Sequence, residues 1–312
     1  MTNRTLQQLG LTATHGMISN PVIAGICVDS RNCSRNDLFA AMPGLVVHGG
    51  EFVPQALRMG AAAILTDTIG LELTQKYVGK IDVPIVVSSE PRRSLALASA
   101  RCYVGQPDSM VAVTGTNGKT SVANFTRQIW ELMGRAAVNF GTTGVEGAYA
   151  AATKHTTPEP VTLHKLLNTL KSVGITHAAM EASSHGLEQQ RLDGVYLLAG
   201  AYTNFSQDHL DYHETFEAYF SAKARLFTHV LPPEGSAVIN IDDPRGKTLV
   251  DIALLRGQGV ITLGTEQGDL QILGARCDAT GQDVRFSWRG EFFTARLNLI
   301  GGFQAQNVLT AA

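Results

Sequence analysis

Short apolar runs and amphipathic segments alternate along the first hundred or so residues. The runs have the length of buried strands, and the segments between them have the three-to-four-residue spacing of helices. We predict strands at residues 22–28, 38–42, 61–65 and 84–87, and helices at 52–59 and 91–103. The sequence Gly105-Gln106-Pro107 then breaks the pattern, which indicates a linker. We therefore predict an N-terminal α/β domain over residues 1–106 and a second domain over 107–312.

The second domain begins as repeated strand–helix units and ends in residues with a two-residue period. Apolar runs typical of strands lie at residues 110–114, 136–140, 177–181, 197–204, 237–241 and 260–263. Helical segments separate most of them, which predicts a parallel sheet with helices on both faces. Alternating residues at 270–275, 284–288 and 292–299 predict a small antiparallel appendage. Residues 301–312 have the pattern of the first turns of a helix.

The composition of the 312 residues is that of a globular protein with a buried core. Hydrophobic residues make up 44% and charged residues 17%, and the net charge of −2 argues against a nucleic-acid partner. No apolar run reaches the length of a membrane span and the N-terminus has no signal core, so we expect a cytoplasmic protein without a membrane partner. The four cysteines lack C-x-x-C spacing, which favours scattered, reduced, structural cysteines. We also expect a monomer.

A glycine loop between a predicted strand and a predicted helix is the most informative motif. The strand ends at Thr114, the loop reads Gly115-Thr116-Asn117-Gly118, and Lys119-Thr120-Ser121 opens the helix. The glycines let backbone N–H groups converge on an anion, the lysine can reach terminal phosphates, and the threonine hydroxyl can bind Mg²⁺. Val113 stands where the usual G-x-x-x-x-G-K-[ST] loop has its first glycine, which disfavours a kinase or GTPase of that class. The motif predicts a P-loop-like, ATP-binding sheet.

Acidic residues and histidines follow two further predicted strands. Glu181 ends one strand, where it can bind Mg²⁺ directly or through water, or cap the next turn. The segment 203–213 follows another strand and contains two aspartates and two histidines: Asp208, His209, Asp211 and His213. Helix capping is the simpler explanation of the aspartates, and we favour His209 over His213 as a ligand. Beside the phosphate loop, a metal role is favoured for Glu181, while the segment 203–213 could form a second Mg²⁺ site or contact the substrate.

Lys223 lies among aromatic residues on one face of a helix predicted over residues 215–229. Phe216, Phe220 and Phe227 share that face with it. One interpretation is a buried amine of lowered pKa, which could react with CO₂ to give a carbamate. The other is an ordinary lysine whose amine extends to solvent. The pattern alone favours the second interpretation.

Two shorter clusters and one arginine have the character of anion or sugar contacts. Asp29-Ser30-Arg31 follows an N-terminal strand, and His155-Thr156-Thr157-Pro158 forms a polar loop in the second domain. Arg191 can hold a carboxylate or phosphate through two hydrogen bonds. A capping turn, a proline turn and a surface salt bridge are the simpler explanations of the three features.

Taken together, these segments resemble the Mur ligase family, above all its members that add the third residue of the peptidoglycan stem peptide. The matching runs span both predicted domains and lie at residues 28–31, 114–121, 156–158, 180–191 and 203–213, with Lys223. The phosphate loop by itself would indicate only the wider ligase superfamily, which includes folylpolyglutamate synthetase. The Asp-Ser-Arg, Thr-Thr-Pro and Asp-His-Leu-Asp-Tyr-His runs make the resemblance more specific.

The resemblance implies a role for each matching position. The phosphates of ATP would contact the glycine loop and the first turn of the following helix, and its adenine would contact Asn307. The residues of the loop and the turn are Gly115, Thr116, Asn117, Gly118, Lys119, Thr120 and Ser121. Mg²⁺ would be bound by Thr120, Glu181, His209 and a carbamylated Lys223, which reverses the interpretation from the pattern alone. Catalysis would depend on Lys119, Glu181, His209 and Lys223. The UDP-sugar would contact Ser30, Leu45, Val46 and Val47, and the muramoyl dipeptide would contact Thr156, Thr157, Ser183, Gln189 and Arg191.

The implied reaction is ATP-dependent amide formation in peptidoglycan synthesis. ATP would phosphorylate the D-glutamate carboxylate of UDP-MurNAc-L-Ala-D-Glu, and the amine of meso-diaminopimelate or L-lysine would attack the acyl phosphate. Two Mg²⁺ ions and Lys119 would offset the charge that gathers there. Family members have a third, C-terminal domain that binds the amino acid, and we expect it to be absent here. An inactive fragment that only binds nucleotide and a ligase like folylpolyglutamate synthetase are the alternatives.

Overall fold

The computed structural model describes residues 3–44, 46–208 and 210–312, which form two compact units. The smaller unit contains the residues up to Gln106 together with Glu159–Thr169 and Gln189–Val195. The larger unit contains Pro107–Pro158, Leu170–Glu188 and Tyr196–Ala312. The first break lies within the Gly105-Gln106-Pro107 linker, whereas the two later segments of the smaller unit fall inside the predicted second domain.

Within the described residues, the smaller unit is built on a five-stranded sheet in the order β2-β7-β6-β5-β4. Its strands are β2 (His15–Gly16), β4 (Gly25–Cys27), β5 (Asp37–Ala40), β6 (Ala63–Thr66) and β7 (Pro84–Val87). Neighbouring strands are parallel, except that β2 is antiparallel to β7.

The predicted strand at 22–28 is wrong as a single element. Its first part, β3 (Val22–Ile23), pairs with β1 (Arg4–Thr5) in a separate antiparallel ribbon, and its second part is β4. The chain passes from one sheet to the other at Ala24, whose N–H donates to the carbonyl of Asn36 at 2.9 Å. An apolar run shows that residues are buried but not which partner strand each one finds.

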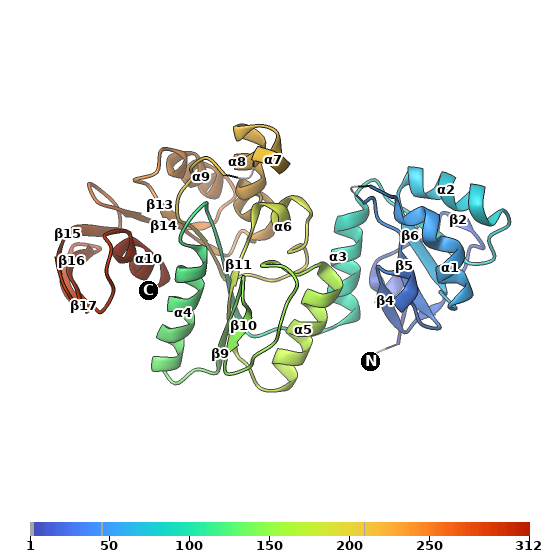
Figure 1. Cartoon of the computed structure of the whole chain (residues 1–312), viewed down its shortest axis with the longest axis horizontal. Helices are drawn as coiled ribbons and strands as arrows, with labels where there is room; N and C mark the ends of the chain where they lie inside the picture. Colours follow the sequence, from blue (N-terminus) through green and yellow to red (C-terminus); the bar gives the residue numbers. More distant parts are fainter. Residues whose placement is uncertain (1–2, 45, 209) are drawn as a thin grey trace. The chain divides into compact units, whose positions relative to one another are not determined.

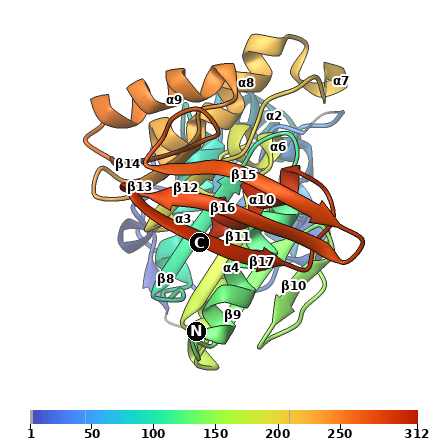
Figure 2. The ribbon, with the colours of Figure 1, turned by 90° about the vertical axis from the view of Figure 1, so that its left-hand side faces the viewer.

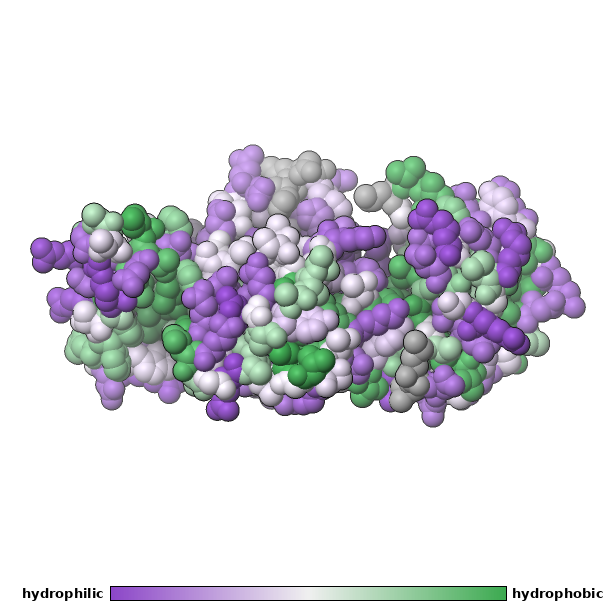
Figure 3. All heavy atoms as spheres, turned by 60° about the horizontal axis from the view of Figure 1, so that its bottom comes forward, coloured by the Kyte–Doolittle hydropathy of each residue, from purple (hydrophilic) through white to green (hydrophobic). Residues whose placement is uncertain are grey.

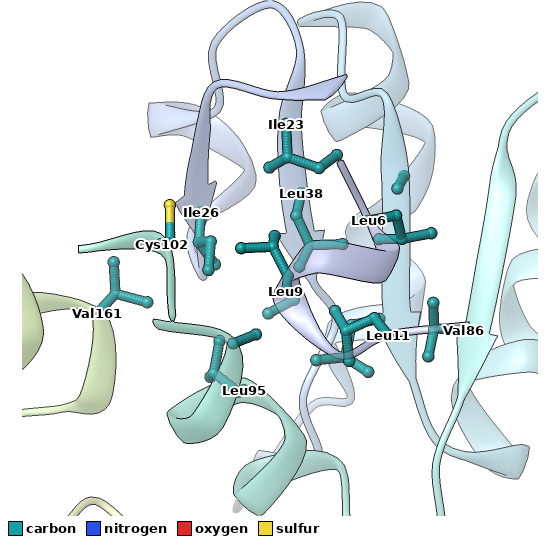
Figure 4. Packing of buried hydrophobic residues seen from close by; sticks show 14 residues of the cluster. Leu6, Leu9, Leu11, Ile23, Ile26, Leu38, Val86, Leu95, Cys102 and Val161 are labelled. Atoms are coloured by element: carbon teal, nitrogen blue, oxygen red, sulfur yellow. The ribbon is translucent and has the colours of Figure 1, made fainter. Parts of the chain in front are cut away.

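Helices cover both faces of this sheet (Figure 1). They are α1 (Val53–Arg58), α2 (Thr68–Val78) and α3 (Pro91–Cys102), with short turns η1 (Gln7–Leu9), η2 (Ser30–Asn32) and η3 (Gly49–Phe52). Successive residues of a strand point to opposite faces. Leu38 therefore packs in the cluster that includes Leu95 of α3, while Phe39 packs with Val53 of α1. Figure 4 shows the first cluster, where Leu9, Ile26 and Leu38 lie close to Leu95.

Helix α2 is absent from our predictions, although a signal for it stands in the sequence. Asp67 precedes the helix, and its carboxylate accepts a hydrogen bond from the Gly70 N–H at 2.8 Å. This is the usual cap of a helix start. Gly70 within the first turn hides the pattern, because glycine is a poor helix former.

The larger unit contains, among the residues described, a ten-stranded sheet in the order β10-β9-β11-β8-β12-β13-β14-β15-β16-β17. The strands are β8 (Ser109–Thr114), β9 (Ala137–Gly141), β10 (Gly144–Gly147), β11 (His177–Glu181), β12 (Ala199–Tyr202), β13 (Ser236–Asn240), β14 (Gly259–Gly264), β15 (Leu270–Asp278), β16 (Gly281–Trp288) and β17 (Glu291–Leu297). From β9 to β14 all neighbours are parallel, which confirms the predicted fold class. β10, which we did not predict, is antiparallel to β9.

The antiparallel strands at the end of the chain continue the central sheet. β15 pairs in parallel with β14 at Leu263–Leu270 and Gly264–Gln271, and then forms an antiparallel ribbon with β16 and β17. Figure 2 shows this ribbon with α10 (Phe303–Ala311) beside it. The predicted appendage is thus an extension of the sheet, and the predicted helix near residue 303 is confirmed.

The other helices of the larger unit connect its parallel strands. They are α4 (Lys119–Leu132), α6 (Ser184–Glu188), α7 (Leu210–His213), α8 (Phe216–Arg225) and α9 (Pro244–Leu255). Helix α5 (Pro160–Ser172) also follows β10 in the chain, but its residues up to Thr169 belong to the smaller unit. The helix predicted over 215–229 begins as expected, since Thr215 caps it by accepting from the Ala218 N–H at 3.1 Å. It ends as a π-helical turn, Leu226–Val230, in which the Leu231 N–H donates to the Leu226 carbonyl at 2.8 Å.

An apolar hollow of about 550 Å³ lies against the central sheet, with Val113, Ile261, Phe286 and Leu309 in its lining. In Figure 3, hydrophobic residues gather on the left-hand part of the visible surface, where β15–β17 and α10 lie.

No helix in the described part of the chain has both the length and the apolar character needed to cross a bilayer.

Cysteines depart from our prediction in one respect. All four are free thiols, but Cys27 and Cys33 are not scattered: the Cys27 thiol donates a hydrogen bond to the Cys33 sulfur at 2.7 Å. The turn η2 lies between them and returns the chain to the end of β4, which the spacing in the sequence does not reveal.

The order of strands brings three loop regions together at one edge of the larger sheet. β8 lies between β11 and β12, with Glu181 opposite Val113 and Tyr202 opposite Thr114. The chain leaves β8 toward β9 on one side, whereas β12 lies on the other. Ligands of open α/β sheets bind at such a reversal of strand order, at the carboxyl ends of the strands.

Candidate nucleotide and metal site

The loop from Gly115 to Gly118 joins β8 to α4 and depends on both glycines. Their φ angles are +145° and +88°, which favour glycine. A Cβ on Gly115 would overlap Thr203 Oγ1, and one on Gly118 would lie 2.5 Å from Asn307 Oδ1. With no side chain at either position, the loop takes the tight course that lets N–H groups of the first turn of α4 face an anion.

Lys119, the first residue of α4, folds back over this loop. Its Nζ donates to the carbonyl of Gly115 at 3.0 Å and to that of Thr116 at 2.7 Å. Burial lowers the pKa of the Lys119 ammonium, while the carboxylates of Glu181 and Asp208 act against that shift. A partly desolvated cation that is held only by carbonyl groups gains from a bound anion.

Glu181 ends β11 with its side chain buried beside α4. Its Oε1 accepts hydrogen bonds from the Thr120 hydroxyl at 2.9 Å and the Thr142 N–H at 3.2 Å. A Cβ on Gly141 would come within 2.6 Å of the same oxygen, so glycine leaves room for it. Burial raises the pKa of Glu181, whereas the hydrogen bond from Thr120, the charge of Lys119 and the hydrogen bond from Thr142 oppose the rise.

Thr120 and Glu181 fit a Mg²⁺ site by their chemistry and their spacing. Mg²⁺ prefers octahedral oxygen ligands at about 2.0–2.1 Å, so adjacent ligands stand about 2.9 Å apart. The Thr120 Oγ1 and Glu181 Oε1 atoms are 2.9 Å apart. A divalent cation would also offset the desolvation of the buried carboxylate. His209, the other predicted ligand at this place, lies outside the described residues.

Lys223 is buried in α8, and this contradicts the interpretation that the pattern alone favours. Its exposed fraction is 1%, so its amine does not extend to solvent. The Nζ donates to the Gly115 carbonyl at 2.7 Å and lies 4.3 Å from the centre of the Tyr219 ring. Phe220 of α8 and Phe227 of the π-helical turn that follows are also buried, whereas Phe216 at the start of α8 is exposed. Only the later part of the predicted apolar stripe therefore packs inward, and it takes the lysine with it.

Two lysine side chains therefore meet at one carbonyl oxygen, that of Gly115. The pKa of Lys223 falls to about 7, first through burial and then through the charge of Lys119, with Asp208 opposing both. Near neutral pH, roughly half of the molecules then carry a neutral amine at Lys223. A neutral amine is the form that can react with CO₂, and an anion formed there would be attracted by Lys119.

A pocket of about 520 Å³ lies between the phosphate loop and α10. Residues from the phosphate loop, α4, the segment after β12, β13 and α10 line it: Asn117, Gly118, Ser121, Thr203, Asn204, Asn240, Phe303, Gln306, Asn307 and Thr310. Asn307, the residue that the resemblance links to adenine, accordingly faces the loop, and its Nδ2 donates to Gln304 Oε1 at 3.1 Å. One aromatic ring among amide and hydroxyl groups is a lining that suits a nucleoside base.

Three polar residues that our site prediction omits hold the phosphate loop in place. The Thr203 hydroxyl donates to the Asn117 carbonyl at 2.6 Å, and Asn204 Oδ1 accepts from the Asn117 N–H at 3.0 Å. Asn240 Nδ2 donates to the Thr203 carbonyl at 2.7 Å. Their signal in the sequence is that each follows or ends a buried strand, at the same sheet edge as Glu181.

The polar segment after β12 supplies charge to the site through Asp208. This carboxylate is among the groups that raise the pKa of both Lys119 and Lys223. His213, the less favoured histidine, is buried with its ring 5.1 Å from that of Tyr219, and its Nδ1 lies 3.5 Å from Glu188 Oε2.

The Thr156–Thr157 loop meets the end of β11. The Thr157 hydroxyl donates to the Glu181 carbonyl at 2.9 Å, accepts from the Ser183 N–H at 3.1 Å and lies 3.0 Å from Ser183 Oγ. Thr156 Oγ1 lies 3.4 Å from Thr142 Oγ1. Thr157 is fully buried, so it supports the backbone of Glu181, while Thr156 is only partly buried.

In the smaller unit, the predicted sugar contacts lie on a turn and a loop. Ser30 is buried, and its hydroxyl donates to Gln55 Oε1 at 3.0 Å. Asp29 caps the turn by accepting from the Arg31 N–H at 3.0 Å, and it also forms an ion pair with the Arg31 side chain at 2.7 Å. Val46 and Val47 are exposed, and Leu45 lies outside the described residues.

Gln189 and Arg191 belong to a segment of the smaller unit. Arg191 donates to Gln189 Oε1 from Nη2 at 2.8 Å and from Nε at 3.2 Å. Gln189 Oε1 thus helps to orient the guanidinium group of Arg191.

Family models match both units of the chain. Residues 113–312 match the Mur ligase middle domain, and residues 22–103 match a domain described as Mur ligase family, catalytic domain.

Curated relatives and a solved structure agree with these matches. A protein of Chelativorans sp. (strain BNC1) named UDP-N-acetylmuramoyl-L-alanyl-D-glutamate–2,6-diaminopimelate ligase is 45% identical over 294 residues, which are 93% of this chain and 59% of that protein. The protein of the same name from Brucella melitensis is 45% identical over 291 residues, 93% of this chain and 58% of its own length. A solved structure of a ligase of that name has a TM-score of 0.86 and 28% identity, covering 99% of this chain and 63% of that one. The chain thus spans about three fifths of the curated relatives that it matches.

Proposed function

The chain belongs to the Mur ligase family, and from that premise we propose that it carries the ATP-binding and UDP-sugar-binding parts of a peptidoglycan ligase. The ligase would join meso-diaminopimelate, or L-lysine, to UDP-MurNAc-L-Ala-D-Glu. One observation supports this more than any other. Lys119 and Lys223 meet at the Gly115 carbonyl, beside the hydrogen bond between Thr120 and Glu181.

In the proposed complex, the phosphates of ATP lie at the N-terminus of α4. Lys119 exchanges its carbonyl acceptors for phosphate oxygens, and its desolvated charge is then offset by a full negative charge. Thr120 and Glu181 hold Mg²⁺, which supplies further positive charge to the phosphates when bound. Asn307 contacts the base from the wall of the pocket.

The proposed chemistry needs no nucleophile from the protein. The D-glutamate carboxylate of the substrate attacks the terminal phosphorus of ATP, ADP leaves, and an acyl phosphate forms. The amine of the incoming amino acid attacks the acyl carbon, gives up a proton, and inorganic phosphate leaves. Both reactants of the first step are anions, so Lys119 and the other positive charges of the site reduce the repulsion between them.

We propose that Lys223 works as a carbamate. Its neutral amine adds to the carbon of CO₂ and loses one proton, which replaces a repelled cation by a carboxylate that can bind a second Mg²⁺. Its pKa of about 7 supports this step, because the reactive neutral form increases as the pH rises through 7.

The carbamate has a test that does not depend on turnover. With ¹³C-labelled bicarbonate, the wild-type chain should give a carbamate carbon signal in NMR spectra that is stronger at pH 8 than at pH 6. Lys223→Ala should lack the signal, and Lys76→Ala, which removes an exposed lysine, should keep it. In a turnover assay, acetate should partly restore Lys223→Ala, because a small carboxylate can enter the space that the side chain leaves. Full activity of Lys223→Ala without acetate would contradict the carbamate.

For the UDP-sugar dipeptide we propose contacts from residues of both units. The smaller unit would contribute Ser30, Leu45, Val46, Val47, Gln189 and Arg191, and the larger would contribute Thr156, Thr157 and Ser183. The exposed valines support this assignment, since an apolar loop can cover the flat face of a uracil ring. Arg191 would pair with a carboxylate of the dipeptide. The monomeric state and the cytoplasmic location stay predictions.

Phosphate release by the chain tests the proposed function. ATP, Mg²⁺ and UDP-MurNAc-L-Ala-D-Glu are supplied with diaminopimelate or with lysine, and each component is left out in turn. We expect release that requires the UDP-sugar dipeptide and the preferred amino acid. Binding of ATP and the dipeptide without release would identify a module that needs further sequence for turnover. Binding of folate instead of the dipeptide would favour the folylpolyglutamate-type alternative.

A further inference from the structure

We propose that Cys27 and Cys33 form a reversible disulfide, so that the turn between them is a thiol-oxidation site in the smaller unit. Cys27 ends β4 and Cys33 follows η2, and their sulfur atoms are joined by a hydrogen bond of 2.7 Å. Of the other cysteines, Cys102 is buried in α3 and Cys277 is exposed in β15. The inference stands independently of the proposed ligase activity.

The turn between the two cysteines fixes their approach. Asp29 accepts from the Arg31 N–H through its carboxylate, and its carbonyl accepts from the Asn32 N–H at 3.0 Å. Both sulfurs pack in the apolar cluster that contains Val53 and Ala56 of α1. A disulfide has an S–S distance of about 2.05 Å, so bond formation needs a movement of less than about 1 Å. The fold of the turn can therefore stay as it is when the bond forms.

A metal site is the competing use of this cluster, because the Asp37 carboxylate lies within 4.8 Å of both sulfurs. Three features argue against it. One oxygen of Asp37 already accepts from the Ser34 N–H at 2.9 Å, and the described residues offer no fourth ligand of these types. A metal needs thiolates, whereas burial raises the pKa of both thiols and the charge of Asp37 raises it further. A neutral disulfide suits these buried surroundings better than two thiolates and a cation.

A pocket next to β4 gives a small oxidant a route toward Cys27. Cys27 lines a pocket of about 370 Å³, together with Tyr103, Glu159 and Lys165. With hydrogen peroxide, the minor thiolate form of one sulfur attacks, the O–O bond breaks, and a sulfenic acid and hydroxide result. Because burial raises the pKa of both thiols, this step should be slow at neutral pH. The second thiol attacks that sulfur, the S–O bond breaks, and water leaves. In total, two thiols lose two electrons and two protons, and peroxide is reduced to two molecules of water.

The oxidised form would brace the turn that carries Ser30. The bond closes a ring around residues 28–32, so the turn can open only together with β4 and α1. Hydrogen exchange of the amides in this turn should then slow, and the smaller unit should unfold at a higher temperature. Because both thiols must lose a proton, the rate of oxidation should increase with pH between 6 and 9.

The test uses the full chain with Cys277→Ser, which removes the exposed thiol and with it cross-linking between molecules. The protein is treated with hydrogen peroxide, quenched, alkylated under denaturing conditions and analysed by peptide mass spectrometry. We expect a peptide pair linked through Cys27 and Cys33, which dithiothreitol separates again. Adding Cys33→Ser should abolish the linked pair and the slower exchange of the turn, while adding Cys102→Ser, a matched buried control, should leave both unchanged.

Three results would overturn the proposal. The first is alkylation of both cysteines after prolonged peroxide treatment at pH 9, where the thiolate fraction is larger than at neutral pH. The second is conversion of Cys27 or Cys33 to a sulfinic acid without a linked pair. The third is binding of one zinc ion per chain that protects the two thiols from alkylation and is lost in Asp37→Asn, which would assign the cluster to a metal.

Discussion

The candidate sites of the two units differ in how far their charged groups are exposed to water. In the larger unit, Lys119, Glu181 and Lys223 are withdrawn from water around one loop, and each has a shifted pKa. In the smaller unit, Asp29 and Arg31 form an ion pair whose side chains are 34% and 77% exposed. Desolvated charges gain much from a ligand of opposite charge, whereas an exposed pair is screened by water and salt.

Under the proposed function, chemistry would take place at the phosphate loop and substrate recognition at the turn of Ser30. The lysines at the phosphate loop would then provide positive charge where a triphosphate and a carboxylate meet. The turn at Ser30 presents a buried hydroxyl next to a pair that already satisfies its own charges. A turn of this kind can select a ligand by shape and hydrogen bonding, but its charges contribute little to the free energy of binding.

We expect the phosphate loop to tolerate a side chain at Gly115 much less well than an ordinary turn does. Gly115→Ala should lower the free energy of unfolding by about 3–5 kcal/mol, because it combines an unfavourable φ with overlap against Thr203. Gly134→Ala is the matched control, since Gly134 also has positive φ but open space around its Cα, and should cost about 1 kcal/mol. Urea titration of both variants measures the losses, and equal losses would contradict the account.

In the smaller unit, the buried histidine His164 should make stability depend on pH. Burial lowers the pKa of His164 from its ordinary 6.5 to about 4, with the backbone of Asp193 acting against the shift. The unfolded chain binds a proton at this residue between pH 6.5 and 4 and the folded chain does not, so stability should fall by about 3 kcal/mol as the pH drops through this window.

Hydrogen exchange of the slowest amides of the smaller unit, followed from pH 7 to pH 4, measures this loss. His164→Gln should flatten the dependence on pH, and His15→Gln, which changes an exposed histidine of the same unit, should leave it unchanged. A profile that is the same in His164→Gln and the wild type would show that His164 does not carry the effect.

The smallest effect is expected at the exposed ion pair. Arg31→Ala should change the free energy of unfolding by less than about 0.5 kcal/mol, as usual for surface pairs. Arg93→Ala is the contrast within the same unit, because Arg93 lies 3.4 Å from the buried carboxylate of Asp193, and it should cost about 1–2 kcal/mol. Thermal unfolding of the two variants compares them, and a large loss for Arg31→Ala would show that the turn depends on its charges.

The parallel sheet and its phosphate loop were predictable because their information is local. Buried parallel strands are continuous apolar runs, and the last residue of each run lies at the carboxyl edge of the sheet, as Thr114 and Glu181 do. The split of residues 22–28 between two sheets was not predictable, since both halves are equally apolar. The grouping of Gln189–Val195 with the smaller unit likewise depends on packing between distant segments.

The candidate site shows the same limit at the level of single side chains. The spacing of Phe220, Lys223 and Phe227 shows that they share a face, but not that this face packs on the phosphate loop. Burial and the pKa of about 7 follow from that packing alone. Contact between Cys27 and Cys33 also depends on the course of a turn, for which six residues of spacing give no signal.

Titration calorimetry with ATP and Mg²⁺ tests directly whether Lys119 and its loop bind the triphosphate of ATP. We expect saturable, Mg²⁺-dependent binding to the wild-type chain and unchanged binding to Lys76→Ala. Binding to Lys119→Ala should be at least about 100-fold weaker, which is a loss of about 2.7 kcal/mol or more in binding free energy. Equal affinity of the wild type and Lys119→Ala for ATP would contradict this expectation.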